Sequence, residues 1–153
     1  MASRKANLPK LSLVVQYASD AAMLPTRPQL RRWVDRVLDA SACRSAQITL
    51  RLVNTEEGRA LNRQFRGKDY ATNVLSFPYA APPEVAGDLA LCVPVVLDEA
   101  KSQGKAAEVH FAHLVVHGML HLQGYDHENG EDAERMEHRE RDILAQLGYP
   151  DPY

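Results

Sequence analysis

The stretch from residue 106 to residue 123 limits the fold more than any other part of this 153-residue chain. Its apolar side chains fall on several sides of a helix instead of along one stripe, and such a helix is stable only where protein surrounds it. We therefore expect residues 106–123 to form a central helix. The chain has no run of 18 apolar residues, so we expect no segment that spans a membrane.

Shorter patterns on either side of this helix predict the elements that cover it. Alternating apolar residues predict strands at 11–17 and 48–52, and short apolar runs predict strands at 74–77 and 88–93. Further helices are expected to begin near Thr26, Asn54, Pro94 and Asn129. The order is β-α-β-α-β-β followed by helices. It predicts an α/β (α+β) fold in one domain, 1–153, with a small mixed four-stranded sheet packed by about five helices.

Local signals predict where several elements begin and end. Asn54, with Glu57 three residues later, has the pattern of a capping box at a helix start. Gly67 is expected to end that helix. Pro78 is expected to close the third strand, and residues 79–86 are expected to form a loop.

The charge is divided unevenly along the chain. Residues 1–76 hold 13 Lys/Arg and 6 Asp/Glu, a balance of +7, whereas residues 77–153 hold 5 and 14, a balance of −9. If the basic half forms one surface, its arginines suit a polyanion such as nucleic acid. If the two halves interleave in the fold, their opposite charges would instead neutralise each other. Cys43 and Cys92 have no metal-like spacing, and no signal peptide is recognisable. Two reduced thiols in a cytoplasmic protein are therefore expected.

The strongest chemical signal is a cluster of histidines on the central helix. Five of the six histidines lie between residues 110 and 127. His117 and His121 are four residues apart, on one face of a helix. Gly124 can end the helix, so that the chain doubles back and brings His127 to the same ion. Three imidazoles with an open fourth position predict one zinc ion per chain that ionises its bound water near pH 7, although imidazole also suits nickel and copper.

The remaining histidines give weaker signals. His113 lies one helical turn before His117, the first predicted ligand, and could help to orient it without binding the metal itself. His110 and His138 are interpreted as core or surface residues. Asp126 could orient an imidazole or cap the turn.

The same histidine spacing occurs in metzincin peptidases, whose motif begins His-Glu-x-x-His. Gly118 stands here where those enzymes carry the glutamate that acts as general base. A zinc peptidase is therefore a minor alternative.

A basic cluster provides the second chemical signal. Arg63, Arg66 and Lys68 lie at a predicted helix end, where cations can bind phosphate or simply favour the helix dipole. An arginine next to a metal-bound water would suit phosphodiester hydrolysis, because it would stabilise the developing charge.

Residues 117–127, HGMLHLQGYDH, resemble the signature of the YbeY family of bacterial endoribonucleases. The stretch from Arg66-Gly-Lys-Asp to Phe77-Pro78 resembles a second block of that family. Gly87-Asp88-Leu89 and the segment LGYPDPY at 147–153 fit as well. The resemblance covers nearly the whole chain.

The resemblance implies a single-strand-specific, metal-dependent endoribonuclease. Such enzymes act in ribosomal RNA maturation, notably at the small-subunit 3′ end, and in ribosome quality control. The resemblance implies zinc ligands at His117, His121 and His127, with Arg66 and His117 as catalytic residues. It also implies a central metal-binding helix resembling that of zincin-type metallohydrolases. The implied partners are single-stranded ribosomal RNA, the ribosome or its small subunit and assembly factors, with no DNA and no membrane.

Two alternatives stay open at this point. The chain could be a ribosome-assembly protein that binds RNA and uses zinc mainly for structure, although structural zinc usually has four ligands. For an endoribonuclease, the nucleophile could be metal-bound water or the 2′-hydroxyl of the RNA.

Overall fold

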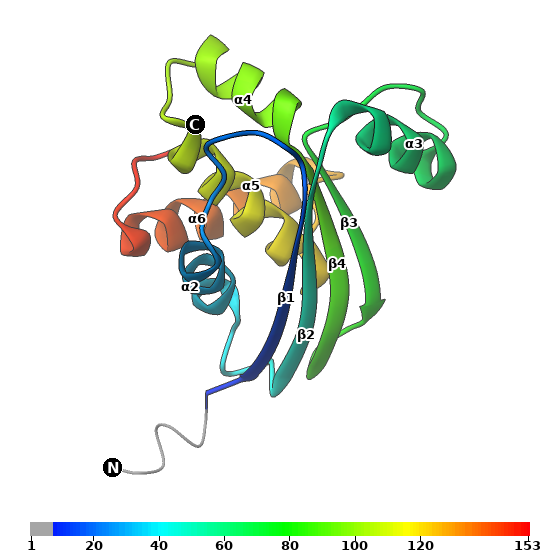
Figure 1. Ribbon diagram of the computed structural model, residues 1–153. Coiled ribbons are helices and arrows are strands. Elements are labelled where there is room, and N and C mark those ends of the chain that lie inside the picture. The colour runs from blue at the N-terminus through cyan, green and yellow to red at the C-terminus, as the bar shows by residue number, and fades with distance from the viewer. Residues whose placement is uncertain (1–7) are drawn as a thin grey trace.

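The computed structural model describes residues 8–153 and contains a four-stranded sheet (Figure 1). The strands are β1 (Lys10–Ala18), β2 (Ser45–Val53), β3 (Val74–Ala80) and β4 (Glu84–Cys92). Their order is β1-β2-β4-β3, with β1, β2 and β4 parallel and β3 antiparallel to β4. The predicted mixed sheet and fold class are confirmed.

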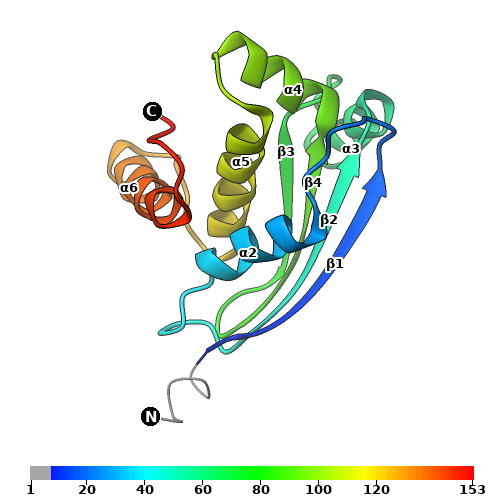
Figure 2. The same cartoon turned by 60° about the vertical axis from the view of Figure 1, so that its left-hand side comes forward.

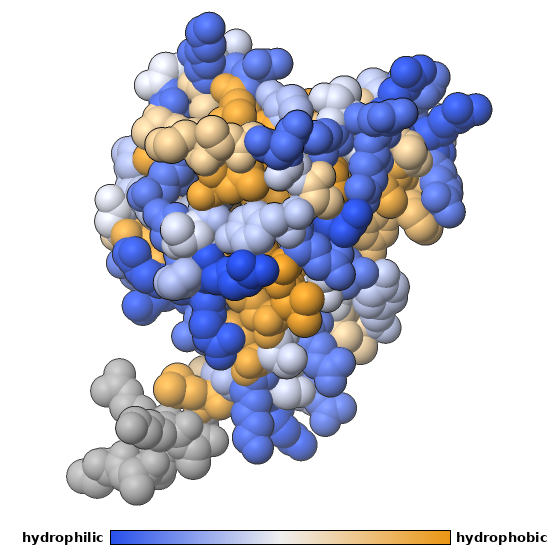
Figure 3. Space-filling model, viewed as in Figure 1, coloured by the Kyte–Doolittle hydropathy of each residue, from blue (hydrophilic) through white to orange (hydrophobic). Residues whose placement is uncertain are grey.

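In the described part of the chain, five helices accompany the sheet: α2 (Arg27–Val37), α3 (Thr55–Arg66), α4 (Val93–Ser102), α5 (Ala107–Leu122) and α6 (Gly130–Leu147). Helix α5 lies between the sheet and α6, with α2 beside it, so the predicted central helix is central (Figure 2). Helix α3 stands apart from α2, α5 and α6, and hydrophilic residues gather over it at the upper right of Figure 3. Within residues 8–153, no helix combines the length and apolar character needed to cross a bilayer.

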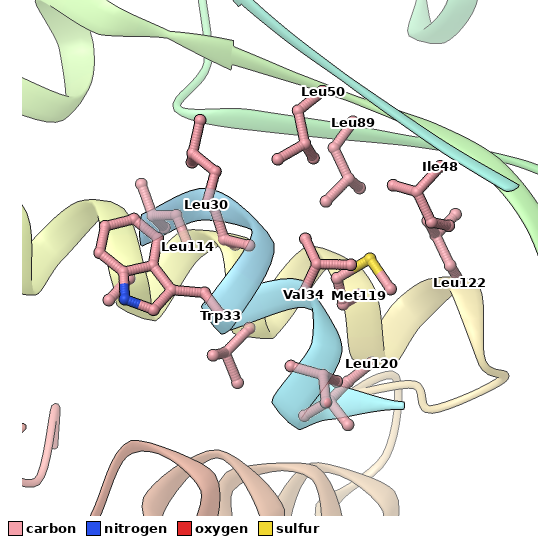
Figure 4. Packing of buried hydrophobic residues seen from close by; sticks show 14 of the residues in the cluster. Leu30, Trp33, Val34, Ile48, Leu50, Leu89, Leu114, Met119, Leu120 and Leu122 are labelled. Atoms are coloured by element: carbon pink, nitrogen blue, oxygen red, sulfur yellow. The ribbon is translucent and has the colours of Figure 1, made fainter. Parts of the chain in front are cut away.

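The main core lies between α2, α5 and the helix-facing side of the sheet (Figure 4). Leu30, Trp33 and Val34 of α2 are fully buried, as the i, i+3, i+4 spacing of that helix requires. Each such side chain contributes about 1.5–3 kcal/mol by leaving water. Cys43 and Cys92 are buried free thiols.

Two glycines bring α5 close to β4. A Cβ atom on Gly118 would lie 2.8 Å from Cδ2 of Leu89, and one on Gly87 would lie 2.6 Å from Cδ2 of Leu122. The helix position at which zinc peptidases carry glutamate therefore faces the buried side of the sheet. A glutamate there would have to displace the buried Leu89 side chain, which weighs further against the minor alternative of a peptidase.

The predicted capping box at the start of α3 is wrong. Asn54 is the N-cap residue, but its side chain makes no cap hydrogen bond. It accepts instead from Ser19 Oγ at 2.7 Å and donates to Asp20 at 3.2 Å. Glu57 pairs with Arg51 on β2 at 2.5 Å. Contacts with residues distant in sequence therefore replace the expected local cap. The predicted end of the helix at Gly67 is confirmed, because Gly67 has a left-handed φ of 71°.

The predicted end of the third strand is also wrong. Strand β3 continues through Pro78 to Ala80, and β4 begins at Glu84, so the predicted loop 79–86 shrinks to residues 81–83. Proline is tolerated because β3 is an edge strand and needs no second hydrogen-bonded neighbour.

Candidate metal centre

Three histidine rings converge where α5 ends. The ring centroids of His117 and His121 are 4.7 Å apart, as expected for residues one helical turn apart. Gly124 then adopts a left-handed φ of 99°, and the chain turns back. The ring of His127 consequently lies 5.6 Å from that of His117 and 5.0 Å from that of His121. The structure thus brings together all three predicted ligands.

Hydrogen bonds on the far side of two rings decide which nitrogens face the centre. Nδ1 of His117 donates to the Glu140 carboxylate, and Nδ1 of His121 donates to the backbone oxygen of Tyr125 at 3.1 Å. Both acceptors lack a proton, so Nδ1 carries the hydrogen in each ring and Nε2 keeps its lone pair.

The two Nε2 atoms lie 3.1 Å apart, an arrangement in which bare lone pairs repel. Tetrahedral zinc with Zn–N bonds of about 2.0–2.1 Å would hold two nitrogens roughly 3.3–3.4 Å apart. One ring nitrogen from each of His117, His121 and His127 lies within 4.8 Å of the other two. The donor set therefore fits a zinc-sized ion with a fourth position left free.

The electrostatic environment favours neutral imidazole at this site. Burial lowers the pKa of His121, and positive charge on His117 and His127 would lower it further. A ligand imidazole must be neutral, so these effects prepare His121 to bind a metal ion.

The histidines form one wall of a cavity of about 850 Å³. Arg66, the last residue of α3, lines the same cavity and makes no ion pair among residues 8–153. Its two predicted companions, Arg63 and Lys68, do not line it. The other walls come from the end of α3, from the residues leading into β3, from β3 itself and from the segment after α5: Phe65, Thr72, Asn73, Val74, Leu75, Ser76, Phe77, Pro78, Gly124, Tyr125, Asp126 and Glu128.

The residue that sequence reasoning missed is Glu140, which is 0% exposed. Burial alone would raise its pKa, but hydrogen bonds from His113, His117 and Tyr153 outweigh burial and bring the pKa to about 2. Glu140 is therefore a carboxylate behind His117. Its sequence signal was its place on the apolar stripe of α6, four residues after Met136 and three before Ile143.

The structure assigns contacts to the remaining histidines. Nε2 of His113 donates to Glu140 at 3.1 Å, which matches the supporting position expected for it. His110 is a core residue that contacts Glu99 at 2.9 Å. His138 lies on the surface.

Of the two roles considered for Asp126, orienting an imidazole or capping the turn, the structure shows the second. Its carboxylate accepts the backbone N–H of His127 at 2.7 Å and so stabilises the turn that presents this histidine.

Comparison with known proteins decides the family. The family model described as endoribonuclease YbeY matches residues 16–148, a span that includes the histidine cluster and Arg66. The chain belongs to the YbeY family. The predicted family, and with it the predicted class of enzyme, is confirmed.

Individual relatives match over nearly the full length. An endoribonuclease YbeY of Aromatoleum aromaticum is 56% identical over 147 residues, which cover 94% of this chain and 93% of the relative. The YbeY of Methylibium petroleiphilum is 54% identical with the same coverage. The solution structure of TM1509 from Thermotoga maritima has a TM-score of 0.57 at 25% identity, covering 90% of this chain and 92% of that one.

Proposed function

We propose that this protein is a zinc-dependent, single-strand-specific endoribonuclease that acts in ribosomal RNA maturation at the small-subunit 3′ end and in ribosome quality control. The observation that carries the proposal is the shared cavity, in which three converging imidazoles face a space that Arg66 also lines. Its partners would be single-stranded ribosomal RNA and the ribosome or its small subunit with assembly factors, in the cytoplasm.

The proposed roles follow from the chemistry of each side chain. His117, His121 and His127 would hold the ion, which supplies a Lewis acid and a bound water that ionises near neutral pH. Arg66 would bind the scissile phosphate and stabilise the charge that develops on it, for which its forked guanidinium is suited.

The nucleophile distinguishes two versions of this reaction. Attack by water leaves no cyclic product, whereas attack by the RNA 2′-hydroxyl leaves a 2′,3′-cyclic phosphate. Mass spectrometry of the cleaved 3′ ends assigns one version, and a cyclic phosphate would exclude water as the nucleophile.

Cleavage of an unstructured RNA oligonucleotide by wild-type protein and by His121→Ala tests the proposal. We expect wild-type activity that a chelator removes, and a folded but inactive variant, because two imidazoles hold zinc weakly. A folded variant that retains activity would refute the proposed site. A variant that binds no RNA because it no longer folds would instead favour the alternative of a mainly structural zinc.

A further inference from the structure

A buried carboxylate lies behind the proposed metal centre. Glu140 is the only acidic side chain that is buried among residues 8–153. One of its oxygens, Oε1, accepts from Nδ1 of His117. The other, Oε2, accepts from Nε2 of His113 at 3.1 Å and from the hydroxyl of Tyr153. Both oxygens are thus occupied by protein donors.

This arrangement limits what Glu140 can do. A carboxylate withdrawn from water is costly unless donors satisfy it, so its three partners are needed to keep it there. Glu140 does not line the cavity. It can therefore reach a bound ion or substrate only through His117.

Tyr153 is held in place from several sides. Its ring packs edge-on against His113 with centroids 5.6 Å apart, and the guanidinium of Arg141 lies 5.3 Å from the ring centroid. Asp151 accepts the backbone N–H of Tyr153 at 2.9 Å and Nε of Arg141 at 3.2 Å. The segment after α6 is thereby folded back so that the tyrosine hydroxyl reaches Glu140.

We propose that Glu140 and Tyr153 are positioning residues for the metal centre. Tyr153 fixes the Glu140 carboxylate, and Glu140 fixes the ring and tautomer of His117, so that the Nε2 lone pair points at the ion and is more basic. Partners of this kind strengthen metal binding without touching the metal. The inference rests on the proposed zinc site and adds two residues to it, one from α6 and one from the segment that follows it.

Zinc affinity tests this inference without relying on enzyme activity. We would measure it by competition with a chromophoric chelator for Tyr153→Phe, which removes only the hydroxyl. The matched control is Tyr149→Phe, because the Tyr149 hydroxyl donates to Glu108 at 2.8 Å and accepts from Trp33, outside the Glu140 contacts. We expect Tyr153→Phe to weaken zinc binding up to about tenfold and Glu140→Gln to weaken it about 10–100-fold. Tyr149→Phe should retain wild-type affinity.

A purely structural role predicts a different pattern. Tyr153→Phe would then lower the stability of the metal-free protein, measured by urea unfolding with chelator present, while leaving the zinc dissociation constant unchanged. That result, or an equal loss of affinity in both tyrosine variants, would overturn the inference. Wild-type protein that binds no zinc would instead refute the metal centre itself. Because Tyr153 is 56% exposed and Phe keeps its ring, we expect Tyr153→Phe to fold even where Glu140→Gln prevents folding.

Discussion

At the scale of single residues, the proposed cleavage of a phosphodiester depends on Arg66, because a metal-binding site alone would not need a cation beside it. Its neighbour Arg59 is neutralised by Asp69 at 2.8 Å, whereas Arg66 has no acidic partner in the described part of the chain and lines the cavity of the histidines. A free guanidinium is available to bind an oxyanion, and a guanidinium already paired with a carboxylate is not.

Replacing Arg66 should therefore affect catalysis more than folding. We expect Arg66→Ala to lower kcat for RNA cleavage by about 10²–10³, the usual effect of losing one charge-stabilising donor. Arg66→Lys should restore only part of the rate, because a lysine lacks the forked donor geometry. The control is Arg63→Ala, which removes an arginine from the same helix end outside the cavity. Equal losses in Arg63→Ala and Arg66→Ala would mean that general positive charge, and not this position, matters.

At the scale of elements, α5 both fills the core and carries two of the three proposed ligands, His117 and His121. These two tasks constrain opposite sides of one turn, because Gly118 contacts β4 while His117 and His121 face the cavity. The approach of helix to strand sets how far the ligands stand from the sheet. A side chain at Gly118 would push α5 outwards.

A larger residue at Gly118 should consequently destabilise the fold. We expect Gly118→Leu to lower the free energy of unfolding by about 1–3 kcal/mol through overpacking against Leu89, measured by urea unfolding with a chelator present. Gly130→Ala serves as the control, since a Cβ at Gly130 meets nothing within 4 Å, and it should change stability little. A Gly118→Leu variant as stable as the wild type would contradict the close packing of α5 on β4.

Elements were predictable where the signal was local. The helix end at Gly67 followed from glycine's access to positive φ, and the turn that returns His127 followed from Gly124. The capping box at Asn54 failed because side chains distant in sequence offered better partners than the backbone of its own helix. A pattern of neighbouring residues gives no information about hydrogen-bond partners that lie far away in the sequence.

At the scale of the whole molecule, the cavity joins parts of the chain that no motif connects. Arg66 comes from the basic half, whereas the histidines, Asp126 and Glu128 come from the acidic half. The histidine triad was predictable because one helix and one turn contain it. That Arg66 of α3 lines the same cavity as the histidines of α5 depends on the strand order β1-β2-β4-β3, and the burial of Glu140 depends on how α6 packs. Neither arrangement can be predicted from the sequence spacing of the residues involved.

Zinc content tests the central claim most directly. The purified wild-type protein, dialysed against metal-free buffer and analysed by atomic emission, should retain about one zinc per chain, and His117→Ala should retain almost none. His138→Ala is the matched control, because His138 is exposed on α6 and, among residues 8–153, pairs only with Asp142 at 3.4 Å, so this variant should keep its zinc. Zinc retained by folded His117→Ala, or absent from the wild-type protein, would contradict the account of the site.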